Sequence, residues 1–221
     1  MPNWCSTEYA IYSDNEIELI RIFMLLKKAT EEAEEHDSRG ILGVLRCPGE
    51  IIDAVDGRTS VKYFSLFDPD HECGKIPAIL IETESAWAPC NDFIEALIRQ
   101  AVSDDGGDVE YCYVSEEEGV GLFVNTDTSG KFFDTRVRVD YATPDGGDVV
   151  YFGDDNFDNF IALLEEIVGE DAVKDIESYE EFLDAKTVKI LDDAFMEKYK
   201  DYKEDIETRE YFLCVNVFES E

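Results

Sequence analysis

The sequence predicts an α+β fold with an antiparallel sheet and an acidic helical lobe after it. Up to Ser115 the apolar residues follow the order strand, helix, strand, strand, helix, strand, which is the split β-α-β pattern of ferredoxin-like folds. Beyond Gly153 they recur at helical spacing. We therefore expect a ferredoxin-like α+β domain with an added hairpin at 1–152. An acidic helical lobe with a closing strand should follow at 153–221 and pack on the first domain.

The first elements follow from alternation and capping signals. Residues 4–12 alternate as a strand, and Ser13 with Glu16 forms a capping box that begins a helix. Four apolar residues at helical spacing define the side of this helix that we expect to be buried: Ile17, Ile20, Phe23 and Met24. Short helical turns, interrupted at Pro48-Gly49, are expected within 39–60.

The middle of the domain supplies the remaining sheet. Strands are expected at 61–67, 76–81, 109–115 and 120–127, with a helix at 91–102. Pro89 suits the first turn of that helix, because a backbone N–H at this position makes no intrahelical hydrogen bond that proline could lose. Trp87 should be buried. The runs 120–127 and 131–141 are expected to pair as a hairpin around Ser129-Gly130.

The C-terminal lobe shows one apolar stripe, a second capping signal and a final alternating run. The stripe ends at Gly169, Ser178 and Glu181 form a capping box, and a helix is expected at 188–202. The closing strand should contain Tyr211 to Val217. The stripe consists of Phe157, Phe160, Ile161, Leu164 and Val168.

Composition limits the class of protein. The 221 residues include 44% hydrophobic residues, which is enough for a core, and no apolar run approaches the length of about 18 residues that a membrane span needs. The first residues lack the basic-then-apolar order of a signal peptide, so we expect a cytoplasmic protein. None of the six cysteines forms a Cys-x-x-Cys pair, and we interpret them mostly as small buried hydrophobes.

The charge is the most unusual property. Asp and Glu number 53 against 19 Lys and Arg, a net charge of −34, and the stretch from Thr143 onward holds 24 acids and 7 bases. This charge excludes direct nucleic-acid and anionic-membrane binding and favours basic partners, such as a DNA-binding protein; the alternative is that it serves solubility alone. The acids that we expect to bind a partner are Glu31, Glu32, Glu34, Glu35, Asp37, Glu165, Glu166, Glu170, Asp171, Asp192, Asp193 and Glu197.

Several patterns in the sequence could form chemical sites. Cys90 near a helix N-terminus, with His71, could be a nucleophile, but no oxyanion motif accompanies them, so a packed cysteine is the better interpretation. The run 154–159 with Glu165 resembles a calcium loop, yet Asn159 replaces the required glycine. Gly119-Val-Gly121 lacks the third glycine of a dinucleotide loop and indicates a tight turn. No cofactor is predicted. The hard-cation candidates from one loop are Asp68, Asp70 and Glu72, together with His71.

Three segments carry a family resemblance: Met-Pro-Asn-Trp-Cys at 1–5, Ser-Ala-Trp-Ala-Pro at 85–89, and Ser-Glu-Glu-Glu-Gly-Val-Gly at 115–121. Over about residues 1–152 the chain resembles the uncharacterised Api-like proteins of phages and mobile elements, whose domain is ferredoxin-like. Where that family often has a second proline after the tryptophan, this chain has Cys90, so no role for that position is carried over. The resemblance implies a fold and a mobile-element origin, and it implies no activity.

Two classes of function remain. The first is an accessory protein that acts by binding another protein, in its sharpest form as a mimic of nucleic acid. The second is a metal-dependent enzyme, or a cation-binding module without turnover, that uses clustered carboxylates. The sequence has no phosphate-binding loop, nucleophile elbow or basic groove, so we favour the first class.

Overall fold

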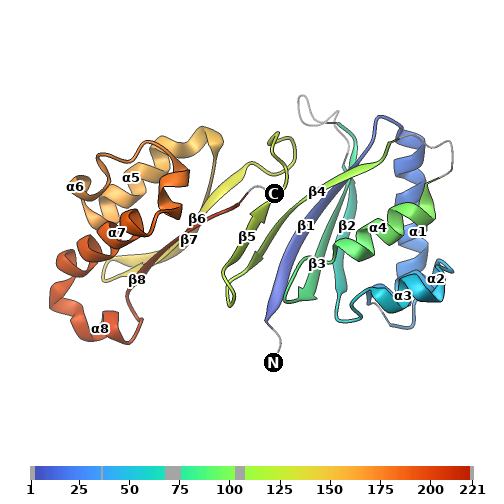
Figure 1. The fold of residues 1–221 in the computed structure, drawn as a ribbon, viewed down its shortest axis with the longest axis horizontal. Helices are drawn as coiled ribbons and strands as arrows, with labels where there is room; N and C mark the ends of the chain where they lie inside the picture. Colours follow the sequence, from blue (N-terminus) through green and yellow to red (C-terminus); the bar gives the residue numbers. More distant parts are fainter. Residues whose placement is uncertain (1–2, 36, 68–75, 103–107, 220–221) are drawn as a thin grey trace. The chain divides into compact units, whose positions relative to one another are not determined.

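The structure is a computed structural model that describes residues 3–35, 37–67, 76–102 and 108–219 (Figure 1). It confirms the α+β class and divides the chain into two compact units, residues 1–133 and 134–221. The boundary lies at 133/134 instead of the expected 152/153, because the strands that follow residue 134 pair with the last strand of the chain. Each unit therefore has a sheet and a hydrophobic core of its own.

The first unit contains a five-stranded antiparallel sheet in the order β2-β3-β1-β4-β5. Because β1 and β2 each pair antiparallel with β3, these two strands run in the same direction with β3 between them. The element order is that of the split β-α-β pattern, with two short helices inserted before β2. The bounds are β1 (Trp4–Tyr12), α1 (Glu16–Glu32), α2 (Ser38–Val44), α3 (Gly49–Ala54), β2 (Ser60–Phe67), β3 (Ala78–Ala86), α4 (Asn91–Ala101), β4 (Glu110–Glu117) and β5 (Leu122–Asn125).

Helices α1 and α4 cover one face of this sheet (Figure 1). The core between them combines Tyr9 and Ile79 from the strands with Leu26 from α1 and Phe93 and Leu97 from α4, all of them fully buried. Burying a side chain of this size stabilises the fold by about 1.5–3 kcal/mol. The apolar face predicted for α4 is thus confirmed.

The orientation of α1 differs from the prediction. Its N-cap is Asn15, whose side chain accepts a hydrogen bond from the Ile17 N–H at 3.2 Å, and Ser13 instead donates to the backbone oxygen of Asp108 at 2.9 Å. The helix buries another stripe, which consists of Leu19, Ile22, Leu26 and Ala29. Of the expected stripe, Ile17, Ile20 and Met24 are exposed by 75%, 50% and 57%, whereas Phe23 is partly buried and packs against the core.

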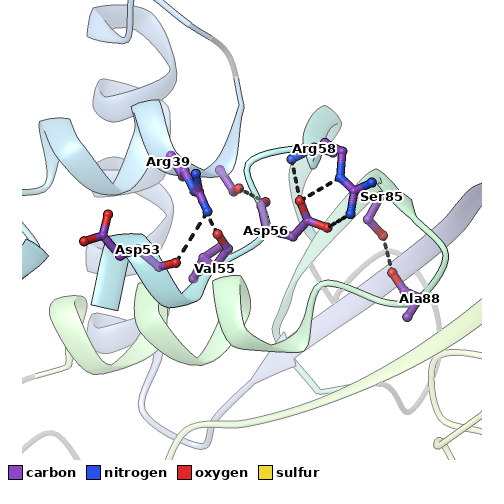
Figure 2. A network of polar contacts seen from close by, with 8 residues as sticks. Arg39, Asp53, Val55, Asp56, Arg58, Ser85 and Ala88 are labelled. Atoms are coloured by element: carbon purple, nitrogen blue, oxygen red, sulfur yellow. Dashed lines mark hydrogen bonds and ion pairs between the residues drawn. The ribbon is translucent and has the colours of Figure 1, made fainter. Parts of the chain in front are cut away.

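The helical turns predicted between residues 39 and 60 are the helices α2 and α3. Hydrogen bonds from a side chain of α2 to backbone oxygens at the end of α3 hold the two helices together (Figure 2). The guanidinium of Arg39 donates to the backbone oxygens of Val55 at 2.9 Å and Asp53 at 3.4 Å, so it satisfies carbonyls that a helix leaves free at its end. Hydrogen bonds from Arg58 lower the pKa of the adjacent Asp56 carboxyl.

The segment after β5 closes the first unit and does not form the expected hairpin. Strand β5 pairs with β4, and the buried Asp127 carboxylate accepts hydrogen bonds from the N–H groups of Phe132 at 2.6 Å and Phe133 at 3.0 Å. These bonds direct the chain across the sheet, so Phe133 packs on Ala10 and Cys112. The face of the sheet opposite the helices is covered at that end by this segment.

The second unit is a three-stranded antiparallel sheet, in the order β7-β6-β8, with helices packed on one face. Val137 and Val139 of β6 meet Phe160 and Leu164 of α5 in its core, and the capping box at Ser178 is confirmed. The bounds are β6 (Thr135–Thr143), β7 (Gly146–Gly153), α5 (Phe157–Val168), α6 (Glu170–Val173), α7 (Ala185–Lys198), α8 (Lys203–Glu207) and β8 (Phe212–Val217), with short 3-10 helices at Asp154–Asn156, Tyr179–Leu183 and Lys200–Tyr202.

Candidate functional site

The antiparallel register brings the three segments of the family resemblance to one end of the five-stranded sheet. Trp4 at the start of β1 pairs with Ala86 at the end of β3, and Ser6 pairs with Glu116 near the end of β4. Residues 3–5, 85–90 and 115–121 therefore lie next to one another. We call this end of the sheet the tryptophan corner, because both tryptophans of the chain lie in it.

The turn after β3 holds the second tryptophan in a strained conformation. Trp87 has a φ of +74°, in the left-handed region, which costs an L-residue about 1–2 kcal/mol. Its N–H donates to the backbone oxygen of Asn3 at 3.1 Å. In the same turn the Ser85 hydroxyl donates to the backbone oxygen of Ala88 at 2.5 Å, as Figure 2 shows. Pro89 precedes the helix instead of lying in its first turn, because Cys90 is the N-cap of α4. Strain of this kind is concentrated at functional sites.

The turn after β4 forms the other wall of the corner. The buried carboxylate of Glu117 accepts hydrogen bonds from the N–H groups of Gly119 at 2.9 Å and Val120 at 2.7 Å. A Cβ at Gly119 would lie 2.0 Å from the side-chain nitrogen of Asn3, and Gly121 has a φ of +71°. The two glycines are thus required by a tight turn, as predicted, and the turn holds Val120 at the surface.

Three large apolar side chains of the corner are in water. Trp4 is 53% exposed, Trp87 45% and Val120 58%. The prediction that Trp87 is buried is wrong, because strand β3 and its inward-facing pattern end at Ala86 and the turn carries the next side chain outward. Tryptophan is the residue type most enriched at the energetic centres of protein interfaces, so two exposed tryptophans at one end of a sheet indicate a binding surface.

Small buried polar groups support the corner from inside. The Ser115 hydroxyl lies 2.8 Å from the Thr7 hydroxyl and 3.0 Å from the Cys5 sulfur, and the Cys90 thiol donates to the Thr83 hydroxyl at 3.5 Å. Burial raises the pKa of both thiols, which favours the neutral form and argues against the nucleophile interpretation of Cys90. His71, its suggested partner, lies outside the described residues.

Carboxylates line the face of the sheet below the corner, opposite the helices. Glu8 of β1 pairs directly with Glu82 of β3, which in turn pairs with Tyr63 of β2, and Tyr63 is 60% exposed. Partial burial raises the pKa of Glu8, and the charges of Glu82 and Glu116 raise it further. Like charges directly opposite each other destabilise a sheet by a few tenths of a kcal/mol to about 1 kcal/mol. A cation bound over this row would remove that cost.

The acids predicted to bind a partner are mostly exposed, and they belong to both units. Asp37 has a structural role, because its carboxylate accepts a hydrogen bond from the Gly40 N–H at 2.7 Å as the N-cap of α2. Asp171 and Glu197 form ion pairs with lysines three residues later, at 3.0 and 2.8 Å. The exposed remainder is Glu31, Glu32, Glu34, Glu35, Glu165, Glu166, Glu170, Asp192 and Asp193.

The cation candidates find no support in the described part of the chain. Asp68, Asp70 and Glu72 lie outside it. In the suspected calcium loop, Arg136 binds both oxygens of Asp154, at 2.7 and 3.0 Å, and the residues 154–156 form a short 3-10 helix. Among the described residues no group of three or more His, Cys, Asp or Glu is placed to hold a metal ion.

No protein-family model, curated protein or solved structure matches the chain. The Api-like resemblance of residues 1–152 therefore stays a prediction. In the residues that the structure describes, no helix has both the length and the apolar character to cross a membrane.

Proposed function

We propose that this chain is a protein-binding module that docks a basic, extended segment of its partner on the tryptophan corner and the glutamate row below it. The observation that carries the proposal is the exposure of both tryptophans at the end of a sheet face that bears the Glu8–Glu82 pair. Exposed aromatic rings attract cations through their faces, and the neighbouring carboxylates attract them by charge. Together they fit Arg and Lys side chains.

The dimensions of the site agree with a short peptide. Trp4 and Glu8 are four residues apart on β1, about 13 Å along a strand, so about four residues of an extended segment would reach from the corner to the glutamate row. An arginine of the segment would stack on a tryptophan while the next basic side chain lies over Glu8 and Glu82. The net charge of −34 would attract such a partner from a distance and speed the encounter.

Fluorescence titration of the full chain tests the proposal. The probes are synthetic hexapeptides that contain arginine, lysine or glutamine at alternate positions. We expect the arginine peptide to quench tryptophan emission and to bind tighter than the lysine peptide, because guanidinium stacks better on an aromatic ring. Trp87→Ala should weaken binding about tenfold or more, as for a central interface aromatic. Equal affinity of wild type and Trp87→Ala for the arginine peptide would refute docking at the corner.

A second form of basic-protein binding uses the helices of the second unit, as a mimic of the nucleic-acid backbone. Its support is the exposure of Glu165, Glu166, Asp192 and Asp193 on α5 and α7. The double substitution Asp192→Asn and Asp193→Asn should then weaken a basic DNA-binding protein and reduce the salt dependence of its affinity, while the hexapeptide titration stays unchanged. If the substitutions leave both affinity and salt dependence as they were, the mimic form is wrong.

A further inference from the structure

One edge of the three-stranded sheet lacks the protection that the other strand edges have. β2 is interrupted by a bulge between Val61 and Tyr63, β5 is only four residues long, and β8 lies against the 3-10 helix Tyr179–Leu183. Bulges, short strands and covering segments keep the edge of a sheet from pairing with another chain. β7 runs for eight residues, and among the described residues no strand pairs with its outer side. It is therefore the edge most open to a further strand.

The backbone of β7 presents hydrogen-bonding groups to solvent along this edge. The hairpin turn pairs Thr143 with Gly146, so every second residue of β7 from Gly146 onward bonds to β6 in the antiparallel ladder. The residues between them, which include Gly147 and Val149, direct their N–H and C=O groups away from β6, and both are exposed. The Val149 N–H donates to the Asp148 carboxylate at 2.8 Å, which agrees with this direction. An extended backbone matches such a row of alternating donors and acceptors.

The side chains of β7 define which strand fits this edge. Val149 and Tyr151 are 47% and 48% exposed on the face away from the helices, where β-branched residues of an added strand can pack against them. Asp148 is exposed on the opposite face, and the stretch 139–173, which contains β7, has ten acids and no Lys or Arg. A lysine of the added strand meets a carboxylate there, whereas β7 of a second copy would meet charge of its own sign.

We propose that β7 is a strand-addition site, at which an extended segment of a partner protein pairs antiparallel to β7 as a fourth strand. In this segment β-branched residues alternate with lysines. The β-branched residues lie opposite Gly147, Val149 and Tyr151, and their N–H and C=O groups bond to those of Gly147 and Val149. The lysines lie opposite Asp148 and Val150. When a partner carbonyl accepts the Val149 N–H, the Asp148 carboxylate is released and can pair with a lysine.

This site is independent of the tryptophan corner. β7 belongs to the second unit, which has a sheet and a core of its own, whereas the corner belongs to the first. The corner binds through aromatic and charged side chains, and the edge of β7 binds through main-chain hydrogen bonds, with side chains setting the register. The strand-addition site therefore does not rest on the proposed function.

Fluorescence anisotropy of dye-labelled octapeptides, titrated with the full chain, tests the proposal. The probe alternates valine and lysine, and two further versions carry N-methyl groups either on the valines or on the lysines, which removes those N–H donors. We expect the parent and the lysine-methylated peptide to bind alike. Methylation of the valines should weaken binding about tenfold or more, because only the valine N–H groups face β7. Any other pattern, including a parent peptide that does not bind, overturns the proposal.

Substitutions in β7 give the reciprocal test. Val149→Pro removes the outward N–H and none of the ladder bonds to β6, so it should keep native circular dichroism and melting but weaken binding of the valine–lysine peptide about tenfold or more. The matched control, Val149→Thr, keeps the N–H and the β-branched shape and should bind as the wild type does. Equal affinity of Val149→Pro and this control would refute strand addition at β7.

A charge reversal provides a test that does not depend on how the strand tolerates proline. Asp148→Lys should weaken binding of the valine–lysine peptide and strengthen binding of a valine–glutamate peptide, because the facing charges change sign. Trp87→Ala should leave both affinities unchanged. If Asp148→Lys has no effect on either peptide, or if Trp87→Ala weakens the valine–lysine peptide, the peptide binds elsewhere and the proposal is wrong.

Discussion

The most direct test of the fold is the substitution Asp127→Asn. The carboxylate of Asp127 is buried and accepts hydrogen bonds from the Phe132 and Phe133 N–H groups and from Ser129. Asparagine keeps one acceptor oxygen but presents an NH₂ group in place of the other. If the oxygen stays on Ser129, that NH₂ group faces two backbone donors, which lose their acceptor. A buried unsatisfied group costs about 1–3 kcal/mol, so we expect a loss of about 2–4 kcal/mol of unfolding free energy.

Urea unfolding followed by tryptophan fluorescence measures this loss, because both tryptophans lie in the first unit. The matched control is Asp37→Asn in the same unit: Asp37 caps α2 through one hydrogen bond from Gly40, and asparagine is an equally good N-cap. The control should change the unfolding free energy by less than about 0.5 kcal/mol. If Asp127→Asn costs no more than this control, the segment 127–133 is not held as described.

The difference in unfolding free energy between wild type and Asp127→Asn should depend on pH in a defined direction. Burial alone would raise the pKa of Asp127, but the hydrogen bonds from Phe132, Phe133 and Ser129 prevail and lower it below 3.8. A group with a lowered folded-state pKa contributes stability that is present above its unfolded pKa and is lost as pH falls through the folded value. The difference between wild type and Asp127→Asn should therefore be constant near neutral pH and shrink below about pH 4. A difference that grows on acidification would contradict the assignment.

Three further predictions concern the corner and the row below it. Trp87→Gly should be about 1 kcal/mol more stable than Trp87→Ala, because glycine accepts a φ of +74° without strain; equal urea midpoints would refute this. Glu8→Gln should stabilise the fold by about 0.2–1 kcal/mol at pH 7, because it removes the repulsion between Glu8 and Glu82. Since the folded-state pKa of Glu8 is raised, this gain should vanish as pH falls toward 4.5. A loss of stability at pH 7 would be inconsistent with repulsion. Gly119→Ala should cost about 1–3 kcal/mol and change tryptophan emission, because the added methyl group displaces Asn3. Gly121→Ala strains the backbone at a φ of +71° but its methyl group meets open space, so it should leave the emission unchanged, and identical spectra of the two variants would count against the contact.

The strands of the first unit and the helix α4 could be predicted because the apolar pattern of each allows only one buried face. In α4 the apolar residues form a single face around Phe93, Ile94, Leu97 and Ala101, so its buried face was determined. In α1 two stripes have helical spacing, Ile17–Ile20–Met24 and Leu19–Ile22–Leu26, and periodicity cannot choose between them. The position of the helix on the sheet decides this, and that is a tertiary property.

Pairing partners and the exposure of turn residues could not be predicted for a related reason. The runs 120–127 and 131–141 look like two arms of a hairpin, but the side chain of Asp127 takes the backbone donors of Phe132 and Phe133 and sends the chain to another sheet. Trp87 follows a buried strand by one residue, and hydrophobicity alone indicates burial. The three segments that carry the family resemblance meet at one end of the sheet because β3, β1 and β4 are neighbouring antiparallel strands. Drawing this strand arrangement from the sequence would have predicted the meeting point.

The place of Asn3 in the tryptophan corner has a practical consequence for how this protein is handled. Its backbone oxygen binds the Trp87 N–H, so Asn3 lies directly at the surface proposed for the partner. An affinity tag or fluorescent protein joined next to Asn3 would stand over that surface and compete with whatever binds there. Fusions at this end should suppress capture of a basic partner, and a cleavable version should restore it after proteolysis.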